Sequence, residues 1–237
     1  MTTQSSTLGF RIRRPHSVLS GLAALLFMIS ISVAAQSDGI ARDYQWSYGG
    51  RTWTLTYSFC EASYRFFRLL PRTLDYADYG VYASDVRDDG DLGGLVAAIE
   101  RLAYGAGLDA WERLNLIISF AQAIPYVTEE GEYPRYPLET LIEMQADCED
   151  ASILAAALLQ QMGFDTILLA FVEEHHMAVG IRVQPPATDA QTYYTWNGQP
   201  YYYLEPTSVG WKIGQKPERY SSQPVIVPPA STLASTH

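Results

Sequence analysis

The chain has 237 residues, 48% of them hydrophobic and 13% aromatic, and its formal net charge is −10 at pH 7. This length and composition suit a globular protein with a sizeable core, and the acidic balance argues against nucleic acid or an anionic membrane surface as a partner. The charge is compatible with a basic peptide substrate, with bound cations, or with a role in solubility alone.

The first 35 residues have the pattern of an export signal. A region with three arginines precedes an apolar run over residues 18–35, which ends in small residues of the A-x-A kind. The pattern predicts a secretory signal peptide cleaved before Gln36. An uncleaved N-terminal anchor is the alternative, because the run is near the lower length limit of a membrane span. We therefore expect an exported protein that is periplasmic, extracellular or membrane-anchored, with membrane contact only through an uncleaved segment.

Beyond the signal segment we expect one domain over residues 36–214, followed by a disordered tail over residues 215–237 that is rich in Pro, Ser and Thr. Without the signal segment, the chain carries 13 Lys and Arg against 26 Asp and Glu, a net charge of −13. The first element of the domain is a predicted β-hairpin over residues 43–58, in which aromatic residues alternate on both sides of Gly49-Gly50. This aromatic stripe is expected to pack against the body of the domain.

Several helices are predicted next, over residues 61–70, 92–104 and 109–124. Between the first two lies a polar, Asp-rich loop that lacks the Glu required at the last position of an EF-hand. Asp109 and Glu112 form a capping-box-like pair. The third helix is apolar on most sides except for a stripe that includes Gln122. One hypothesis is that Gln122 reaches a cleft and helps to bind an oxyanion; the alternative is a structural glutamine bonded to backbone.

A fourth helix is predicted to begin beside Cys148, after a long loop over residues 125–140. Asp147 is its expected N-cap, and Gly163 follows its end. A thiol at a helix N-terminus feels the positive end of the helix dipole, which lowers its pKa and favours the thiolate. Cys148 is therefore a candidate nucleophile, although most free cysteines are inert packing residues.

Strands are predicted over residues 166–172, 175–183, 191–196 and 201–205, the last two joined by a turn at Asn197-Gly198. In the second strand the alternation places His176 on the face with small side chains, where a helix could approach closely. We therefore expect His176, and not His175, to meet the cysteine helix. With Glu205 on a neighbouring strand, a nucleophile, a base and an orienting carboxylate would come together.

Three blocks of residues carry a family resemblance: residues 147–150 around the cysteine, residues 176–180 around the histidine, and residues 203–207 around Glu205, followed by residues 210–214. In these blocks the sequence resembles the transglutaminase-like superfamily of cysteine enzymes. It is most similar to prokaryotic exported members such as the bacterial transglutaminase-like cysteine proteinases. The resemblance covers roughly residues 43–220.

The resemblance implies an α+β fold with a papain-like core: a buried cysteine helix packed on an antiparallel sheet, with an N-terminal β-hairpin and a helical lead-in. The catalytic core would span about residues 109–214. Carried over by position, Cys148 is the nucleophile, His176 the general base and acid, and Glu205 the orienting carboxylate. The family usually has Asp at this last position, so the backbone must absorb one extra methylene.

The acidic residues beside the cysteine, Asp147, Glu149 and Asp150, oppose the thiolate. Either they point to solvent and backbone caps, or a cation lies among them. Some exported relatives in the resembled family bind calcium at these positions, and hard oxygen ligands suit Ca²⁺; the chemistry itself requires no cofactor. If Cys148 is a nucleophile it must stay free, which leaves Cys60 as an unpaired packing residue. A merely structural domain would instead allow a Cys60–Cys148 disulfide.

The activity implied by these residues is acyl transfer on peptide or protein amides, with hydrolysis preferred and a peptide or protein as substrate. Two alternatives remain open. One is a catalytically silent module of the same fold that binds a peptide or a glycan. The other is a cross-linking transglutaminase, in which an amine replaces water as the acyl acceptor.

Overall fold

Over the residues that the computed structural model describes, two antiparallel sheets and six α-helices form an α+β fold. The structure describes residues 39–128, 131–186 and 191–230. All of these residues belong to one compact unit, Gln36–His237. The predicted signal peptide lies outside the described residues. Within the described ranges, no helix has the length and apolar character needed to cross a membrane.

The predicted N-terminal hairpin is confirmed, as β1 (Gly39–Tyr48) and β2 (Arg51–Cys60). Gly49 and Gly50 both have positive φ, +60° and +72°, which the tight turn requires and which glycine adopts without strain. As expected, its aromatic stripe packs inward. Trp46 stacks on Trp53 and meets Phe120 edge-on, with ring centroids 6.5 and 5.2 Å apart.

The α-helices are α1 (Glu61–Leu69), α2 (Gly80–Ala83), α3 (Asp89–Gly105), α4 (Ala110–Gln122), α5 (Pro137–Glu143) and α6 (Cys148–Gln161). The predicted capping box of α4 is present, since Asp109 accepts from the Glu112 N–H and Glu112 accepts from the Asp109 N–H. The sequence prediction missed α5, which begins at Pro137 inside the expected loop, and α2, which lies in the expected polar loop.

The second sheet has five antiparallel strands in the order β5-β6-β4-β3-β7. The strands are β3 (Thr166–Phe171), β4 (His176–Ile181), β5 (Tyr193–Trp196), β6 (Gln199–Leu204) and β7 (Val225–Val227). As predicted, Asn197-Gly198 forms the β5–β6 turn, with positive φ at both residues.

The prediction of a disordered tail from residue 215 is wrong over residues 215–230. This segment contains β7, an edge strand of the second sheet. It pairs with Leu168, Leu169 and Ala170 of β3. Val227 is 1% exposed. Proline and serine lower the propensity for regular structure, but tertiary pairing and burial override that preference here. Residues 231–237 lie outside the described residues.

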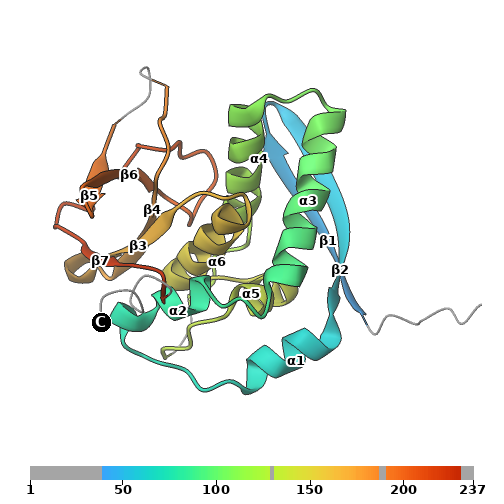
Figure 1. Cartoon of the computed structure of the whole chain (residues 1–237), viewed down its shortest axis with the longest axis horizontal. Helices are drawn as coiled ribbons and strands as arrows, with labels where there is room; N and C mark the ends of the chain where they lie inside the picture. Colours follow the sequence, from blue (N-terminus) through green and yellow to red (C-terminus); the bar gives the residue numbers. More distant parts are fainter. Residues whose placement is uncertain (1–38, 129–130, 187–190, 231–237) are drawn as a thin grey trace, which may run out of the picture. The chain divides into compact units, whose positions relative to one another are not determined.

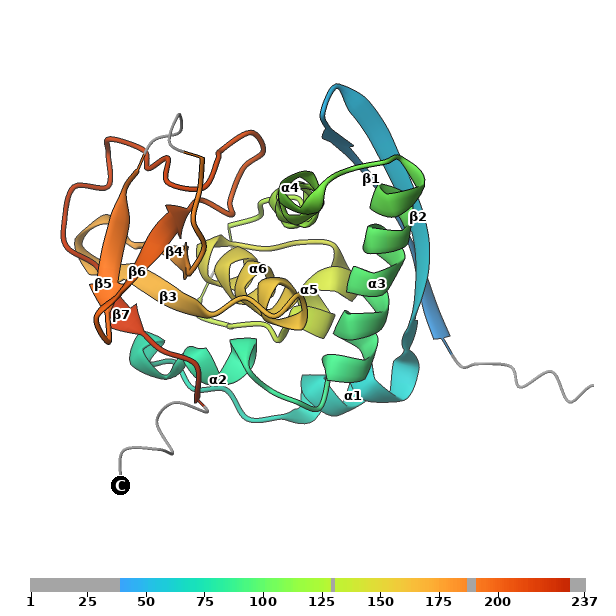
Figure 2. The ribbon, with the colours of Figure 1, turned by 45° about the horizontal axis from the view of Figure 1, so that its top comes forward.

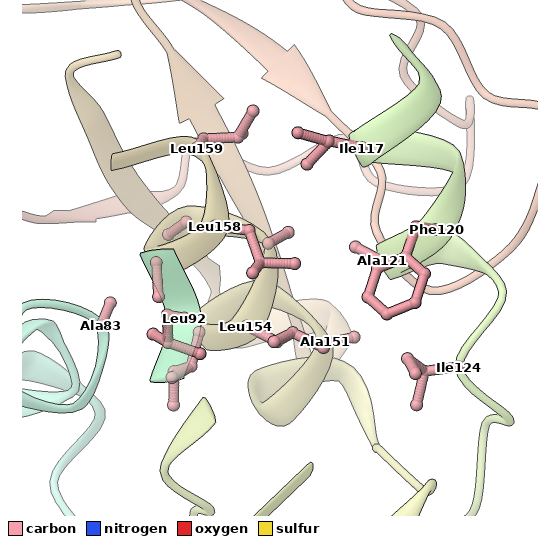
Figure 3. Close-up of a cluster of buried hydrophobic side chains, with 14 of the residues drawn as sticks. Ala83, Leu92, Ile117, Phe120, Ala121, Ile124, Ala151, Leu154, Leu158 and Leu159 are labelled. Atoms are coloured by element: carbon pink, nitrogen blue, oxygen red, sulfur yellow. The ribbon is translucent and has the colours of Figure 1, made fainter. Parts of the chain in front are cut away.

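Helix α6 lies at the centre of this unit. It packs on β3 and β4 on one side and on α3, α4 and α5 on others, and the β1–β2 hairpin lies beyond α3 and α4 (Figures 1 and 2). Figure 3 shows Leu154, Leu158 and Leu159 of α6 facing Ile117 and Phe120 of α4. Because α6 is apolar on nearly all sides, burial fixes its position and hence that of its first residue, Cys148.

Candidate active site

The cysteine is placed at the first position of α6, as predicted. The Asp147 carboxylate caps the helix by accepting from the Asp150 N–H at 3.1 Å. Asp147 has an extended backbone, which is usual for an N-cap residue. The thiol therefore projects from a helix end that is fixed by a cap and by the surrounding core.

A buried ion pair fastens the same helix end to the segment before α5. The carboxylate of Asp150 accepts from the Arg135 backbone N–H at 2.7 Å and from the Arg135 guanidinium at 2.6 Å. The side chains of Arg135 and Asp150 are 5% and 0% exposed. Arg135 also donates to Glu143 of α5. Removing either partner of such a pair leaves a buried charge without compensation.

Replacing Arg135 with alanine should therefore lower the free energy of unfolding by about 3–5 kcal/mol. The matched control is Arg182→Ala, because the Arg182–Asp165 pair has a similar distance, 2.8 Å, but side chains that are 49% and 60% exposed. That control should cost about 0–1 kcal/mol. Chemical denaturation measures both changes, and equal losses in the two variants would contradict this role of Arg135.

The thiol of Cys148 lies among polar groups. It donates to Glu149 Oε2 at 3.1 Å and lies 3.9 Å from the carbonyl oxygen of His175. Burial is the largest cause that raises the pKa of Cys148, followed by the charge of Glu149; a hydrogen bond from the Met177 backbone opposes them. The expectation that the helix end lowers this pKa is therefore wrong for the free protein, because desolvation and a neighbouring carboxylate outweigh the dipole.

His176 and Glu205 meet as predicted. His176 Nε2 lies 3.0 Å from Glu205 Oε2, and the two side chains are 6% and 1% exposed. His175, by contrast, is exposed and has a positive φ of 48° just before β4 begins. Since a carboxylate accepts, His176 donates through Nε2, which leaves Nδ1 as the ring nitrogen able to accept a proton.

The face of β4 that packs against α6 is the opposite of the predicted one, although His176 itself meets the carboxylate. Met177, Val179 and Ile181, on the other face of β4, share the core cluster of α6. Ala178 packs instead in a second cluster, with Phe171 and Tyr203, on the far side of the sheet. His176 is the first residue of β4, and Cys148 is the first residue of α6. The start of the strand and the start of the helix meet at one cavity, which brings the two side chains into the same site.

Besides His176, two other residues donate hydrogen bonds to the Glu205 carboxylate. Tyr203 Oη donates to Oε2 at 2.7 Å, while the Thr207 N–H and Oγ1 donate to Oε1 at 3.1 and 2.6 Å. Burial acts to raise the pKa of Glu205, but the hydrogen bonds and charge of His176, with Thr207 and Tyr203, outweigh it and the pKa is lowered. The longer glutamate side chain thus reaches His176 with both oxygens satisfied.

Gln122 does not act as the hypothesis of an oxyanion donor requires. Its amide Nε2 donates to the carbonyl oxygens of Glu205 at 2.8 Å and Trp211 at 3.0 Å, and the residue is 4% exposed. Both N–H groups of the amide are therefore used on backbone. Gln122 instead ties α4 to the segment that carries Glu205, which is the structural alternative.

Cys148 and His176 line the same cavity, which has a volume of about 260 Å³. Two carboxylates, of Glu132 and Glu149, also line it. The rest of the lining consists of His175 and of apolar or aromatic residues: Leu74, Tyr76, Tyr79, Ala170, Phe171, Val172 and Met177. The cavity therefore places a thiol and an imidazole beside a largely apolar wall.

The three acidic residues considered for calcium do not fit a shared ion. Asp147 caps the helix, Glu149 accepts from the thiol, and both oxygens of Asp150 face Arg135. Within the described ranges, no group of three or more His, Cys, Asp or Glu side chains is arranged to hold a metal. A Ca²⁺ site needs six or more oxygens directed at one point, so the calcium hypothesis is not supported by these residues.

Cys60 is exposed and free, so it is not the packing residue that was expected. No disulfide joins it to Cys148.

Sequence reasoning also missed two residues of the site. Glu149 was seen only as one of three acids, and Tyr220, which stacks on His176, fell in the predicted disordered tail. The aromatic residue in a Pro- and Ser-rich stretch was the one available signal for Tyr220.

No protein-family model matches the chain, and no curated protein matches it. Among solved structures, it is similar to "a Putative Cysteine Protease from Cytophaga hutchinsonii", with 13% sequence identity and a TM-score of 0.37. The match covers 70% of this chain and 62% of that chain, so the chain spans less than two thirds of that protein's length. This is a weak, fold-level resemblance, and it assigns no role to any residue here.

Proposed function

We propose that the chain is a cysteine-dependent acyl-transfer enzyme of papain-like, transglutaminase-like type that hydrolyses amide bonds in peptides or proteins. The observation that carries the proposal is that His176, which lines the same cavity as Cys148, is bonded to the buried Glu205 carboxylate at 3.0 Å. A nucleophile, a base and an orienting carboxylate are the parts that nucleophilic catalysis of this kind requires.

In the first half-reaction, Cys148 Sγ attacks the amide carbonyl carbon and its proton passes to His176 Nδ1. The C–S bond forms and the C–N bond breaks, and the imidazolium returns the proton to the departing amine. Water then attacks the thioester carbonyl carbon and gives a proton to His176; the C–S bond breaks, the carboxylic acid leaves, and the imidazolium returns the proton to Cys148 Sγ. Glu205 holds the ring with Nε2 protonated throughout and stabilises its positive charge.

The negative oxygen that forms on the carbonyl needs hydrogen-bond donors. We assign the Cys148 backbone N–H to this role, because the first N–H groups of a helix have no partner within the helix. Those of Asp150 and Ala151 are already bonded to Asp147. The helix dipole adds to the stabilisation at the same point.

The raised pKa of Cys148 indicates that the resting enzyme holds a neutral thiol, so proton transfer to His176 must accompany the attack. The Glu149 carboxylate contributes to this state, since a negative neighbour disfavours a second negative charge. Glu149 therefore restrains the reactivity of Cys148 in the absence of substrate.

Replacing Glu149 with glutamine should lower the pKa of Cys148 and move the midpoint of its alkylation by iodoacetamide to lower pH. The rate at pH 7 should rise about threefold for each pKa unit lost, because more thiolate forms but a thiolate of lower pKa is a weaker nucleophile. Glu100→Gln, on α3 and outside the cavity lining, is the matched control. An unchanged profile in Glu149→Gln would contradict the role given to Glu149.

The charges in the cavity bear on the substrate. Glu132 and Glu149 line it, and none of the described lining residues is Lys or Arg. An acidic side chain next to the scissile bond would be repelled there, whereas neutral and cationic side chains would not. We therefore expect neutral or basic residues near the cleavage point.

A peptide-binding module without turnover is the second candidate, and one observation favours it: the thiol donates to Glu149 and its pKa is raised rather than lowered. The two functions are separated by profiling the cleavage products of a protein mixture treated with the wild type or with Cys148→Ala. New N-termini produced by the wild type alone support the enzyme. Identical products, with peptides retained by both proteins, support the module.

A further inference from the structure

The imidazole of His176 has a second neighbour besides Glu205. The ring of Tyr220 lies parallel to it, with ring centroids 3.9 Å apart and an interplanar angle of 6°. Tyr220 is 6% exposed and belongs to the cluster that contains Phe171 and Tyr203. One face of the proposed base is thus covered by a residue from the C-terminal segment.

Polar contacts hold Tyr220 in this place. The backbone N–H groups of Ser221 and Ser222 each donate to Glu174 Oε1 at 2.8 Å, and Ser222 Oγ donates to Glu174 Oε2 at 2.5 Å. Glu174 lies two residues before His176, so the clamp joins the C-terminal segment to the start of β4. The guanidinium of Arg219 donates to Tyr220 Oη at 2.6 Å and lies over the Tyr220 ring.

We infer that Tyr220 is a positioning residue, whose ring face holds the His176 imidazole in the plane in which Nε2 meets Glu205 and shields that hydrogen bond from water. The physical reason is the freedom of the ring. The terminal torsion of histidine is broad, so a hydrogen bond at one nitrogen alone leaves the ring able to turn. A parallel ring in contact removes that rotation, and the exclusion of water strengthens the charged hydrogen bond beneath it.

The test uses the full chain and the proton on His176 Nε2, whose NMR resonance is assigned by its loss in His176→Gln. Tyr220→Leu removes the flat face while keeping apolar bulk, and Tyr220→Phe keeps the face. Tyr194→Leu is the matched control, because Tyr194 packs on Phe171 in the same cluster, 6.1 Å between ring centroids, and has no ring contact with His176. Glu174→Ala opens the clamp from a half-buried position and replaces Tyr220→Leu if that variant does not fold.

In Tyr220→Leu we expect the Nε2 proton to exchange with water about tenfold faster or more, since local opening controls exchange. Tyr220→Phe and Tyr194→Leu should stay within about twofold of the wild type, and Glu174→Ala should exchange faster than the wild type. An exchange rate unchanged in both Tyr220→Leu and Glu174→Ala would overturn the inference. So would an equal rise in Tyr194→Leu, because that would indicate general loosening of the cluster.

The inference rests on the proposed function for its effect on turnover, which is measured separately with p-nitrophenyl acetate as the acyl donor. Tyr220→Leu should lower kcat by about tenfold or more with little change in KM, because a misplaced base slows the chemical step. Tyr220→Phe should restore kcat. If the exchange rates change as expected but the wild type and Cys148→Ala hydrolyse the ester equally, the positioning role stands and the proposed function fails.

Discussion

Replacing Cys148 with alanine is expected to abolish acyl transfer. Without Sγ no thioester can form, and the loss of a catalytic nucleophile costs on the order of 10⁶ in kcat. Turnover of p-nitrophenyl acetate and of a fluorescently labelled protein such as casein should fall to the uncatalysed rate. Because Cys148 is at the first position of α6 and is only partly buried, the variant should keep the fold.

The matched control for this variant is Cys60→Ala. Cys60 is the other free cysteine and is exposed at the start of α1, outside the cavity lining. Its removal should leave turnover unchanged, which excludes a non-specific effect of losing a thiol. Activity that persists in Cys148→Ala, or that disappears equally in Cys60→Ala, would show that Cys148 is not the nucleophile.

Replacing Glu205 with glutamine should lower kcat by roughly 10²- to 10⁴-fold, since the variant keeps the size of the side chain and removes its charge. The amide of glutamine has only one oxygen, so it cannot accept all the hydrogen bonds that the two carboxylate oxygens of Glu205 accept. Glu205 accepts from His176, from Tyr203 and twice from Thr207, so a donor NH₂ group must face one of these donors. The His176 ring then loses its tautomer or its orientation, and kcat falls while KM changes little.

Glu218→Gln is the control for charge, because Glu218 is exposed and lies outside the cavity lining. Tyr203→Phe is the control for the carboxylate contacts. It removes one donor to Oε2 but leaves the bond to His176, so its effect on kcat should be smaller than that of Glu205→Gln. A Glu205→Gln enzyme with wild-type kcat would mean that His176 does not depend on this carboxylate.

The elements that sequence patterns predicted well have strong local signals. The hairpin followed from alternation around Gly49-Gly50, and the cysteine helix from an apolar run bounded by Asp147 and Gly163. The elements that were missed have weak local sequence signals. Helix α5 is seven residues long inside a proline-containing loop, and β7 has three residues whose stability comes from pairing with β3.

Some features of the site were likewise predicted from the sequence, and others were not. Sequence reasoning selected Cys148, His176 and Glu205. The structure brings His176 and Glu205 together, and Cys148 and His176 line one cavity. The sequence prediction misjudged the face of β4, because an apolar alternation does not reveal which face a helix covers when both faces are buried.

The partners of single polar groups could not be predicted. Gln122 bonds to carbonyl oxygens that are 83 and 89 residues away in sequence. The Asp150–Arg135 pair and the stacking of Tyr220 on His176 likewise depend on tertiary contacts between separate elements. Burial is the largest cause of the raised pKa of Cys148 and depends on the tertiary packing around it, so the effect of the helix end could not be judged from its position alone.

The most direct test of the central claim is the rate at which p-nitrophenyl acetate acetylates Cys148, followed by mass spectrometry and peptide mapping in the wild type and in His176→Gln. If His176 takes the thiol proton, the wild type should gain one acetyl group on Cys148 and none on Cys60, roughly 10²- to 10⁴-fold faster than His176→Gln. Equal rates in the two proteins, or acetylation of Cys60 as fast as that of Cys148, would contradict it.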